Sequence, residues 1–371
     1  TGATPASITV SDGPTYDYGN LANGASLDHT FTLSNGGGVQ ATGMSGGGLS
    51  APFFYKGGSY PGTGGTCAAT LTAASTCTIV VTYNPTTNAA HSSTINIAYN
   101  NGLSGQNATR AVIGTGVPPA SLAISDGATY DFGTVATGGI AEKTFTITNN
   151  GSYAASLMAG AGLSAPFTFK GGAYPGTVGN CGATLNPSAS CSVVVRYAPS
   201  STGTQSGSLD ITYYDGANNQ TSSRPVQGTG AAPATLSISD GPTYNYGTVA
   251  NGSSNDKSFT LTNSGGVPAI SISGAGLSAP FTFKGGSYPG TGGTCSATLS
   301  ASGTCTIVVN YSPTTIATHN ATMSVTYNDG VTGQSTSRDV QGTAVAPALI
   351  TVSDGPTYNF GSVANGSSND K

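Results

Sequence analysis

Charged side chains are scarce in this chain of 371 residues. Asp, Glu, Lys and Arg make up only 6% of it, against about a quarter in an ordinary soluble domain. The chain has one glutamate, Glu142, and three histidines. So few titratable groups argue against an enzyme that relies on acid–base chemistry. So few cations, at a net charge of −4, argue against a partner such as nucleic acid, whose phosphate backbone needs a basic surface.

Long apolar runs and metal-binding patterns are missing as well. No apolar stretch approaches the ~20 residues that a membrane-spanning helix needs, so the sequence predicts no membrane span in this segment. The cysteines show no C-x2-C spacing of a zinc site, and no D-x-D-x-D-G loop for calcium is present. The sequence therefore predicts no metal site and no cofactor.

A long internal repeat organises the whole chain. Cys67, Cys181 and Cys295 follow one another at a step of 114 residues (181 − 67 and 295 − 181), with no insertion between the copies. The repeat predicts junction residues 1–5, three complete domains at 6–119, 120–233 and 234–347, and the first strand or strands of a partial fourth at 348–371. We interpret the chain as a slice of a longer array. The alternative is that the partial fourth repeat is a segment for head-to-tail assembly.

Each repeat has the size and the pattern of a β domain. A unit of 114 residues can bury its own core. Runs such as "KTFTITN" (143–149), "CSVVVRY" (191–197) and "SLDITYY" (208–214) alternate apolar and polar residues, which is typical of strands. Asn-Gly and Asp-Gly pairs between such runs predict hairpin turns. We expect seven or eight strands per repeat in an all-β, immunoglobulin-like antiparallel β-sandwich, with a closed barrel as the weaker option.

The cysteines form one C-x9-C pair in each repeat. This spacing predicts one disulfide per domain and therefore an oxidising compartment, extracellular or at the cell surface. The alternative is that the thiols are free and buried. The predicted disulfide cysteines are Cys67 and Cys77, Cys181 and Cys191, and Cys295 and Cys305.

A glycine-rich stretch precedes the first cysteine of each pair, as in "FFYKGGSYPGTGGTC" from Phe53 to Cys67. It lacks the G-K-[ST] ending and the following helix of a phosphate-binding loop. Three interpretations stay open: an isopeptide crosslink through the lysine, a sugar bound by the lysine and the tyrosine, and a Tyr-Pro-Gly turn with the lysine at its soluble tip. We favour the turn. The candidate contact residues are Lys56, Tyr60, Lys170, Tyr174, Lys284 and Tyr288.

Other polar residues recur at the same step or change between copies. The aspartates of the "SDG" triplets are expected to cap turns through Asx hydrogen bonds. His29 aligns with two lysines, and His91 aligns with a glutamine and a histidine. Because no histidine position is filled in all three copies, we expect solvated surface residues and no repeated active site. The four aspartates are Asp12, Asp126, Asp240 and Asp354.

The order of these motifs resembles a known family. Each copy begins with a motif like "YDFGTVATG", followed by an F-T-[IL]-[ST]-N strand and "APF". The cysteine pair and a strand that ends in Tyr-x-Pro come next, and the first two copies end with "GTG". This order is similar to the bacterial choice-of-anchor D, or ASH/Hydin-like, immunoglobulin-type domains of secreted and surface proteins. The resemblance covers the whole of each repeat. It implies a tandem extracellular β-sandwich module without catalytic residues.

The sequence as a whole predicts a structural protein. We expect a non-enzymatic repeat module that forms the shaft of an extracellular fibre, stalk or adhesin. The short, proline-containing linkers predict an elongated rod of domains stacked end to end. Expected partners are the neighbouring repeats and further copies of the chain in a fibre. The segment Ala348–Lys371 is expected to pack at the end of the third repeat or to complete a neighbouring chain.

Two alternatives remain at this stage. In one, an adhesin binds cell-surface or matrix glycans through the "KGGSYPG" loops and gains avidity from many weak sites. In the other, the repeats are accessory domains of a secreted hydrolase.

Overall fold

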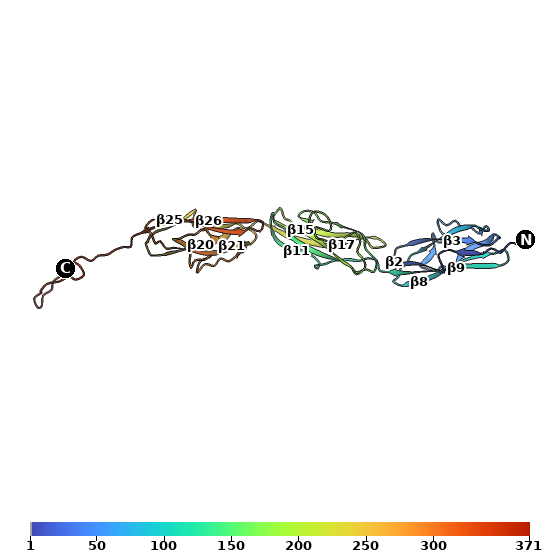
Figure 1. Ribbon diagram of the computed structural model, residues 1–371, viewed down its shortest axis with the longest axis horizontal. Coiled ribbons are helices and arrows are strands. Elements are labelled where there is room, and N and C mark those ends of the chain that lie inside the picture. Colours follow the sequence, from blue (N-terminus) through green and yellow to red (C-terminus); the bar gives the residue numbers. More distant parts are fainter. Residues whose placement is uncertain (1) are drawn as a thin grey trace. The chain divides into compact units, whose positions relative to one another are not determined.

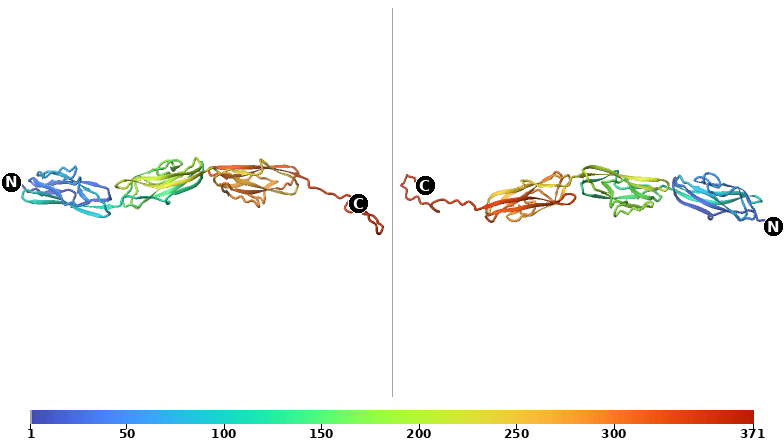
Figure 2. Two further views of the ribbon diagram at one scale, coloured as in Figure 1. Left: turned by 180° about the vertical axis from the view of Figure 1, so that it is seen from behind. Right: turned by 90° about the horizontal axis from the view of Figure 1, so that it is seen from above.

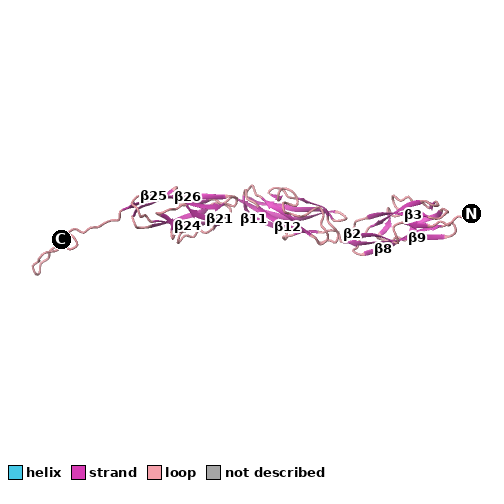
Figure 3. Cartoon of the chain, in the orientation of Figure 1, coloured by secondary structure: helices cyan, strands magenta, loops and turns pink. Residues whose placement is uncertain are grey.

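The computed structural model describes residues 2–371, and these residues form strands and loops without a helix (Figure 3). Thr1, counted above with junction residues 1–5, lies outside the described residues. The strands gather into three bodies in chain order (Figure 1). By its contacts the chain divides into two compact units, Thr1–Val135 with Ile140–Gly230, and Ala136–Gly139 with Ala231–Lys371. The first unit holds repeats 1 and 2, and the second holds repeat 3 together with one turn from repeat 2.

Repeat 1 is a two-sheet sandwich. One sheet has the strand order β1-β3-β7-β5 and the other has the order β2-β9-β8-β4-β6. Apolar residues from both sheets form one buried cluster, so the two sheets pack face to face. The strands are β1 (Ile8–Val10), β2 (Thr15–Ala22), β3 (Leu27–Asn35), β4 (Ala41–Gly47), β5 (Phe53–Tyr55), β6 (Thr70–Leu71), β7 (Thr76–Tyr83), β8 (Ala90–Asn100) and β9 (Gly105–Val117).

Repeat 2 has the same arrangement with one strand fewer. Its sheets have the orders β10-β12-β15-β14 and β11-β17-β16-β13. An isolated bridge between Ala155 and Leu185 stands where the other repeats have a two-residue strand. The strands are β10 (Leu122–Ile124), β11 (Tyr130–Ala136), β12 (Ala141–Asn149), β13 (Ser156–Ala161), β14 (Phe167–Phe169), β15 (Ser190–Tyr197), β16 (Gly203–Tyr214) and β17 (Asn219–Ala231).

Repeat 3 reproduces repeat 1 strand for strand. Its sheets have the orders β18-β20-β24-β22 and β19-β26-β25-β21-β23. The strands are β18 (Leu236–Ile238), β19 (Thr243–Ala250), β20 (Asn255–Asn263), β21 (Ala269–Ala275), β22 (Phe281–Phe283), β23 (Thr298–Leu299), β24 (Thr304–Tyr311), β25 (Thr318–Asn328) and β26 (Gly333–Val345).

The fold is the tandem array of all-β, immunoglobulin-like sandwiches that the sequence predicts, with two refinements. Repeats 1 and 3 have nine strands each, which is more than the seven or eight expected. The strands β5, β6, β22 and β23 have only two or three residues, so the sequence shows no alternation that would reveal them. One pairing in each of repeats 1 and 3 is parallel, since β2 runs parallel to β9 and β19 runs parallel to β26. The parallel pair arises because the "SDG" turn carries the chain from the first sheet to the second. In that turn Asp12 and Gly13 both have φ at 69°.

The core follows the predicted alternation with one addition. Phe145 and Ile147 of β12, and Val193 and Val195 of β15, are fully buried on the inner face. Val194 points to the opposite face and is nevertheless only 3% exposed. The glycine-rich loop covers it, because the backbone N–H of Val194 donates to the carbonyl of Pro175 at 2.8 Å.

Two polar side chains hold each sandwich together from inside. An asparagine at the end of the second long strand is at most 1% exposed and bonds to several loops through its amide group. An arginine of the last strand donates from Nη2 to a backbone carbonyl of the first strand, which belongs to the opposite sheet. The asparagines are Asn35, Asn149 and Asn263, and the arginines are Arg110, Arg224 and Arg338.

The segment after β26 forms no strand. Figure 2 shows it as a thread, and Leu349, Ile350 and Val352 are 85–88% exposed. The expected packing against repeat 3 is therefore not seen. In a complete repeat this first strand pairs with residues further along the chain, as Ile8 does with Asn35. The assignment of 348–371 to a fourth repeat stays a prediction.

Candidate functional site

The glycine-rich loop is packed onto its own domain. In repeat 1 it begins at the end of β5 and folds over the outer face of β7. The backbone N–H of Val80 donates to the Pro61 carbonyl at 2.8 Å, and the N–H of Lys56 donates to the Val80 carbonyl at 3.0 Å. A Cβ atom at Gly62 would lie 2.2 Å from the Val80 carbonyl oxygen, and its φ is 89°. Glycine is required here because two backbones meet, not because a ligand needs room.

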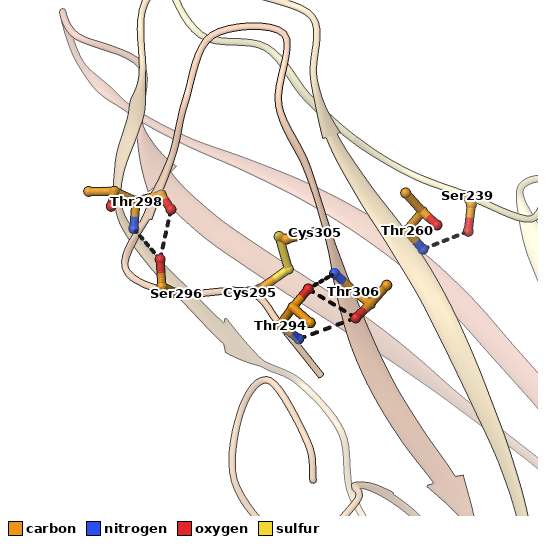
Figure 4. Close-up of a disulfide and its surroundings, with 8 residues drawn as sticks. All are labelled: Ser239, Thr260, Thr294, Cys295, Ser296, Thr298, Cys305 and Thr306. Atoms are coloured by element: carbon orange, nitrogen blue, oxygen red, sulfur yellow. Dashed lines mark hydrogen bonds between the residues drawn. A yellow bond between two sulfur atoms is a disulfide. The ribbon is translucent and has the colours of Figure 1, made fainter. Parts of the chain in front are cut away.

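The loop ends on a disulfide in every repeat. Cys67 is joined to Cys77, Cys181 to Cys191, and Cys295 to Cys305, each across a sequence separation of 10. Figure 4 shows the third bond beside a reciprocal pair of hydrogen bonds. Thr294 N donates to Thr306 Oγ1 at 3.2 Å, and Thr306 N donates to Thr294 Oγ1 at 3.0 Å. The loop is therefore fixed to β24 both covalently and by hydrogen bonds.

The loop tyrosines serve as packing residues. Tyr60 meets Tyr55 edge to face at 5.7 Å between ring centroids, and a Cβ atom at Gly46 would lie 2.5 Å from the Tyr60 ring. The hydroxyl groups of Tyr60 and Tyr288 are buried and have no hydrogen-bond partner among residues 2–371. Burial raises the pKa of Tyr288 to about 12. A buried hydroxyl cannot reach a ligand outside the domain.

Tyr174, the counterpart in repeat 2, packs in the same manner. Its ring lies 5.7 Å from the Phe169 ring, edge to face, and a Cβ atom at Gly160 would be 2.6 Å from it. Burial raises its pKa to about 12 as well. All three loop tyrosines thus pack edge to face against an aromatic residue of their own domain, across a glycine of the neighbouring sheet.

The loop lysines are ion-paired. Lys56 Nζ lies 2.7 Å from Asp28 Oδ2, and Lys284 Nζ lies 2.7 Å from Asp256 Oδ2. The hydrogen bond from Lys56, aided by one from Thr82, lowers the pKa of Asp28 against a weaker effect of burial. An isopeptide bond forms from a neutral carboxyl group with a buried acid beside it. A half-exposed carboxylate that is held ionised does not provide that chemistry.

Repeat 2 builds the same pair with the single glutamate. Lys170 Nζ lies 2.7 Å from Glu142 Oε2, while Arg196 Nη2 lies 2.9 Å from Glu142 Oε1. The hydrogen bonds from Lys170 and then Arg196 lower the pKa of Glu142. The prediction left the lysine free at the tip of a turn, and the structure instead ties it to the second long strand of its sandwich.

The "SDG" aspartates contact a basic side chain instead of forming the expected Asx turn. Asp126 Oδ1 lies 2.7 Å from Lys143 Nζ, and Asp12 Oδ2 lies 3.3 Å from His29 Nε2. The predicted Asx hydrogen bond is formed five residues later, where Gly19 N donates to Asp17 Oδ1 at 2.7 Å. The prediction was wrong about position because Asp12 itself has left-handed backbone geometry and turns its carboxylate toward β3.

The same basic side chain also lies on an aromatic ring. Lys257 Nζ is 4.6 Å from the centroid of the Tyr244 ring, and Lys143 Nζ is 4.9 Å from that of Tyr130. In repeat 1 the ring of His29 stacks on Tyr16 at 3.8 Å with an interplanar angle of 17°. His29 therefore fills a structural position that lysine fills in the other copies.

His91 has a structural contact that the sequence did not reveal. The buried Tyr83 bonds through its hydroxyl to His91 Nδ1 at 2.9 Å, and Thr87 Oγ1 lies 3.0 Å from His91 Nε2. His319 repeats both distances, and in repeat 2 the Tyr197 hydroxyl donates to Gln205. The expectation of a solvated residue without a role is corrected. The recurring tyrosine eight residues earlier is the signal that points to this bond.

Within residues 2–371, no group of three or more His, Cys, Asp or Glu side chains is placed to hold a metal ion. The same residues contain no helix of the length and apolarity needed to traverse a bilayer. A surface hollow over β21, β25 and β26 is lined without any carboxylate, histidine or lysine, by Ser271, Thr326, Tyr327, Asn328, Gly333, Gln334 and Ser335.

Comparison with known proteins points to one domain family. Residues 124–228 and 235–343 match the family described as HYDIN/CFA65/VesB-like, Ig-like domain, and these ranges cover more than half of the chain. No curated protein sequence matches.

Several solved structures are similar at low identity. Titin domains I67–I69 are 12% identical, with 92% of this chain and 99% of that chain covered and a TM-score of 0.32. The human CEP192 ASH/PapD-like domain is 15% identical, covering 31% and 89%, with a TM-score of 0.25. The Vibrio cholerae VesB protease is 16% identical, covering 30% and 32%, with a TM-score of 0.24.

Proposed function

The chain belongs to the HYDIN/CFA65/VesB-like Ig-like domain family, and from this premise we propose that it is a non-enzymatic spacer that forms the shaft of an extracellular fibre, stalk or adhesin. The polar side chains that recur in all three copies are engaged inside their own sandwich. The lysine is ion-paired, the loop tyrosine is packed, and the asparagine and arginine bridge strands. A domain whose recurring polar side chains all stabilise its own fold is suited to hold other parts of a protein at a fixed distance.

The observation that carries the proposal is the parallel pairing of the second strand with the last strand of a sandwich, which is seen in repeats 1 and 3. In repeat 3, β19 lies beside β26 from Thr243 opposite Asp339 to Ala250 opposite Val345. The three-residue β18 precedes β19 in the chain, so tension reaches β19 after β18 has been pulled from its sheet. Tension between the start of β19 and the end of β26 then pulls two parallel strands in opposite directions. The hydrogen bonds between them are then loaded together in shear, instead of being opened one at a time.

Two further features fit an extracellular shaft. Each repeat has its own disulfide, and disulfides persist in oxidising compartments. The bond removes about ten residues from the length that an unfolding repeat can release. The linkers "VPPA" and "AAPA" contain proline and are short, which favours stiff connections between sandwiches.

Single-molecule stretching of the 371-residue chain from its two ends tests the proposal. We expect three unfolding events with equal gains in length, one for each sandwich. Reduction of the disulfides should add about 30 Å to each gain, since about ten residues at ~3.6 Å each are released from a bond whose Cα atoms are 4.8 Å apart. Smooth extension without resolved events would contradict a load-bearing role.

A glycan array separates this function from carbohydrate binding. The chain should give no signal that depends on the loop lysines. The control is the triple variant Lys56→Ala, Lys170→Ala, Lys284→Ala, which leaves the disulfides and the core in place. Glycan binding by the native chain that disappears in this variant would overturn the spacer in favour of an adhesin that binds through its repeats.

A further inference from the structure

The linker between repeats 1 and 2, both of which belong to the first compact unit, is bonded at its two ends. It has the sequence "VPPA" at 117–120. The Val117 carbonyl accepts a hydrogen bond from Asn23 N of repeat 1 at 2.9 Å, and Ala120 N donates to the Asp215 carbonyl of repeat 2 at 2.9 Å. Two prolines, whose rings fix φ, stand between these bonds. Each end of the linker is therefore held by the sandwich that it joins.

A turn of repeat 1 packs against a hairpin loop of repeat 2 beside this linker. We name residues 22–25 the tip turn and residues 215–218 the receiving loop. Ala22, the first residue of the tip turn, is 0% exposed. Tyr153 and Ala217 of repeat 2 pack against the core cluster to which Ala22 belongs. The core of repeat 1 thus continues into repeat 2 at this turn.

A glycine of the receiving loop makes room for the alanine of the tip turn. A Cβ atom at Gly216 would lie 2.7 Å from the Ala22 Cβ and 2.5 Å from the Tyr153 ring. A Cβ atom at Gly24, in the tip turn, would lie 3.7 Å from the Ala217 Cβ. The turn and the loop therefore approach as closely as backbones without larger side chains allow.

The second compact unit contains the same contact, made by the tip turn of repeat 2, which is grouped with repeat 3. Ala136 belongs to the core cluster that contains Val267. A Cβ atom at Gly330 would lie 3.0 Å from the Ala136 Cβ and 3.2 Å from Val267 Cγ2. A Cβ atom at Gly138 would lie 3.9 Å from Val331 Cγ1. The alanine and the glycine of the contact thus recur at the step of 114 residues.

The two side chains beside the glycine differ in size between the two contacts, and they differ in opposite directions. Tyr153 at the first position corresponds to Val267, and Ala217 at the second position corresponds to Val331. A large and a small side chain surround the first alanine, whereas two of intermediate size surround the second. Packed interiors tolerate exchanges that keep the total volume, so the pattern indicates a space that both side chains fill together.

Both parts of the contact are ordered by bonds within their own sandwich. Asp215 Oδ1 accepts hydrogen bonds from the backbone N–H of Ala217 at 2.8 Å and of Asn218 at 2.7 Å. In the tip turn, Gly24 N donates to the Pro85 carbonyl at 2.9 Å. Segments that are ordered before they meet lose little conformational freedom in the contact.

We propose that the tip turn and the receiving loop form a fixed joint, which holds repeats 1 and 2 in one orientation by packing and not by the linker alone. The alanine and the glycine set the closest approach, and the two flanking side chains fill the space around them. The inference rests on the proposed function and deepens it, because a spacer keeps its length only when its joints do not bend.

Spin labels on repeats 1 and 2 measure whether the joint is fixed. Thr30→Cys and Thr144→Cys put labels at corresponding, exposed positions of β3 and β12. The six native cysteines are all in disulfides and do not take the label. Double electron–electron resonance on the whole chain should give one narrow distribution of distances between the two labels.

A charge in the joint should loosen it. Ala22→Asp should widen the distribution about twofold, because it buries a carboxylate without a partner in an apolar contact. Ala123→Asp is the matched control, since it adds the same charge at an exposed alanine of β10 and should leave the width unchanged. Hydrogen exchange in the core of repeat 1 checks that the Ala22→Asp chain is folded. Equal widths in the folded variant and the control would overturn the proposal.

An exchange of side-chain sizes tests the joint without a buried charge. Ala217→Val overfills the space beside Tyr153, and Tyr153→Val leaves it partly empty, so each change alone should widen the distribution. Together they reproduce the pair Val267 and Val331, and the double variant should recover the narrow width of the parent. Single changes without effect, or a double variant wider than either single one, would refute the joint.

The labels and the stretching experiment fail separately. If the parent chain already gives a distribution as broad as that of Ala22→Asp, the joint is refuted, and three unfolding events on stretching would still support the spacer. If the distribution is narrow and responds to the variants while stretching gives smooth extension, the joint stands and the load-bearing function is refuted.

Discussion

Replacement of Asn263 by alanine should destabilise repeat 3 more than any surface change. This side chain is fully buried at the end of β20. Its Oδ1 accepts two backbone N–H groups and its Nδ2 donates to three backbone carbonyls. The partners are Thr235 N (3.2 Å), Gly265 N (3.0 Å), Val267 O (2.9 Å), Leu299 O (3.2 Å) and Ser300 O (3.1 Å).

The magnitude follows from how many of these groups water can reach after the change. Three of the five bonds, those to Gly265, Val267 and Leu299, are buried, and the other two are part-buried. A buried backbone group that loses its partner costs about 1–3 kcal/mol. With some relaxation of the loops, Asn263→Ala should lower the free energy of unfolding of repeat 3 by about 3–6 kcal/mol. This is a large share of the 5–15 kcal/mol that is typical of a domain.

Hydrogen exchange read by mass spectrometry on the whole chain measures this effect, because peptides report on each repeat separately. Core amides of repeat 3 should exchange at least a hundredfold faster in the variant, while those of repeats 1 and 2 serve as internal controls. Asn328→Ala removes an exposed turn bond to Gly330 N and should change exchange little. A loss below 1 kcal/mol in Asn263→Ala would refute the view that this amide holds the loops together.

Four further outcomes are expected. Reduction of the disulfides should cost about 3 kcal/mol per repeat by the chain-entropy model and lower the melting temperature by roughly 10–20 °C, checked by calorimetry with and without reductant. Acid should destabilise the chain, because the hydrogen bond from Lys257 lowers the pKa of Asp240; that stability is present above the unfolded value near pH 4 and is lost as the pH falls through the folded value. Alkali should do the same between pH ~10 and ~12, because burial raises the pKa of Tyr288 to about 12, and tyrosinate absorbance follows this titration. Gly274→Ala should cost about 1–3 kcal/mol in chemical denaturation, since its Cβ would lie 2.3 Å from the Tyr288 ring, whereas Gly333→Ala, with no atom within 4 Å, should be tolerated.

The sequence was a good guide wherever a local pattern determines the structure. Alternation in "KTFTITN" predicted that Phe145 and Ile147 share a buried face, and both are fully buried. The Asn-Gly and Asp-Gly pairs predicted the hairpins that join β8 to β9 and β25 to β26. The C-x9-C spacing predicted cysteines that are close enough to bond. In each case the interacting residues lie within a dozen or so positions of one another.

Pairings between distant residues were not predictable in the same way. Thr15 lies opposite Ala111 in the parallel pair of β2 and β9, and no local signal indicates a contact over that separation. Val194 alternates like a solvent-facing residue and is buried because a loop covers it. The alternatives for Lys56 could not be separated for the same reason, since its partner Asp28 comes from another strand.

Differences between the copies show which contacts the fold requires. The buried Tyr83, Tyr197 and Tyr311 bond to His91, Gln205 and His319, so the identity of the partner changes while a bond to the tyrosine hydroxyl is kept. The lysine of the loop pairs with aspartate in two copies and with glutamate in the third, again at 2.7 Å. If these side chains bound an external ligand, an exchange of histidine for glutamine would alter that site. An exchange that preserves only an internal bond is what selection for the stability of each sandwich allows, and it supports a function that depends on the sandwich as a whole.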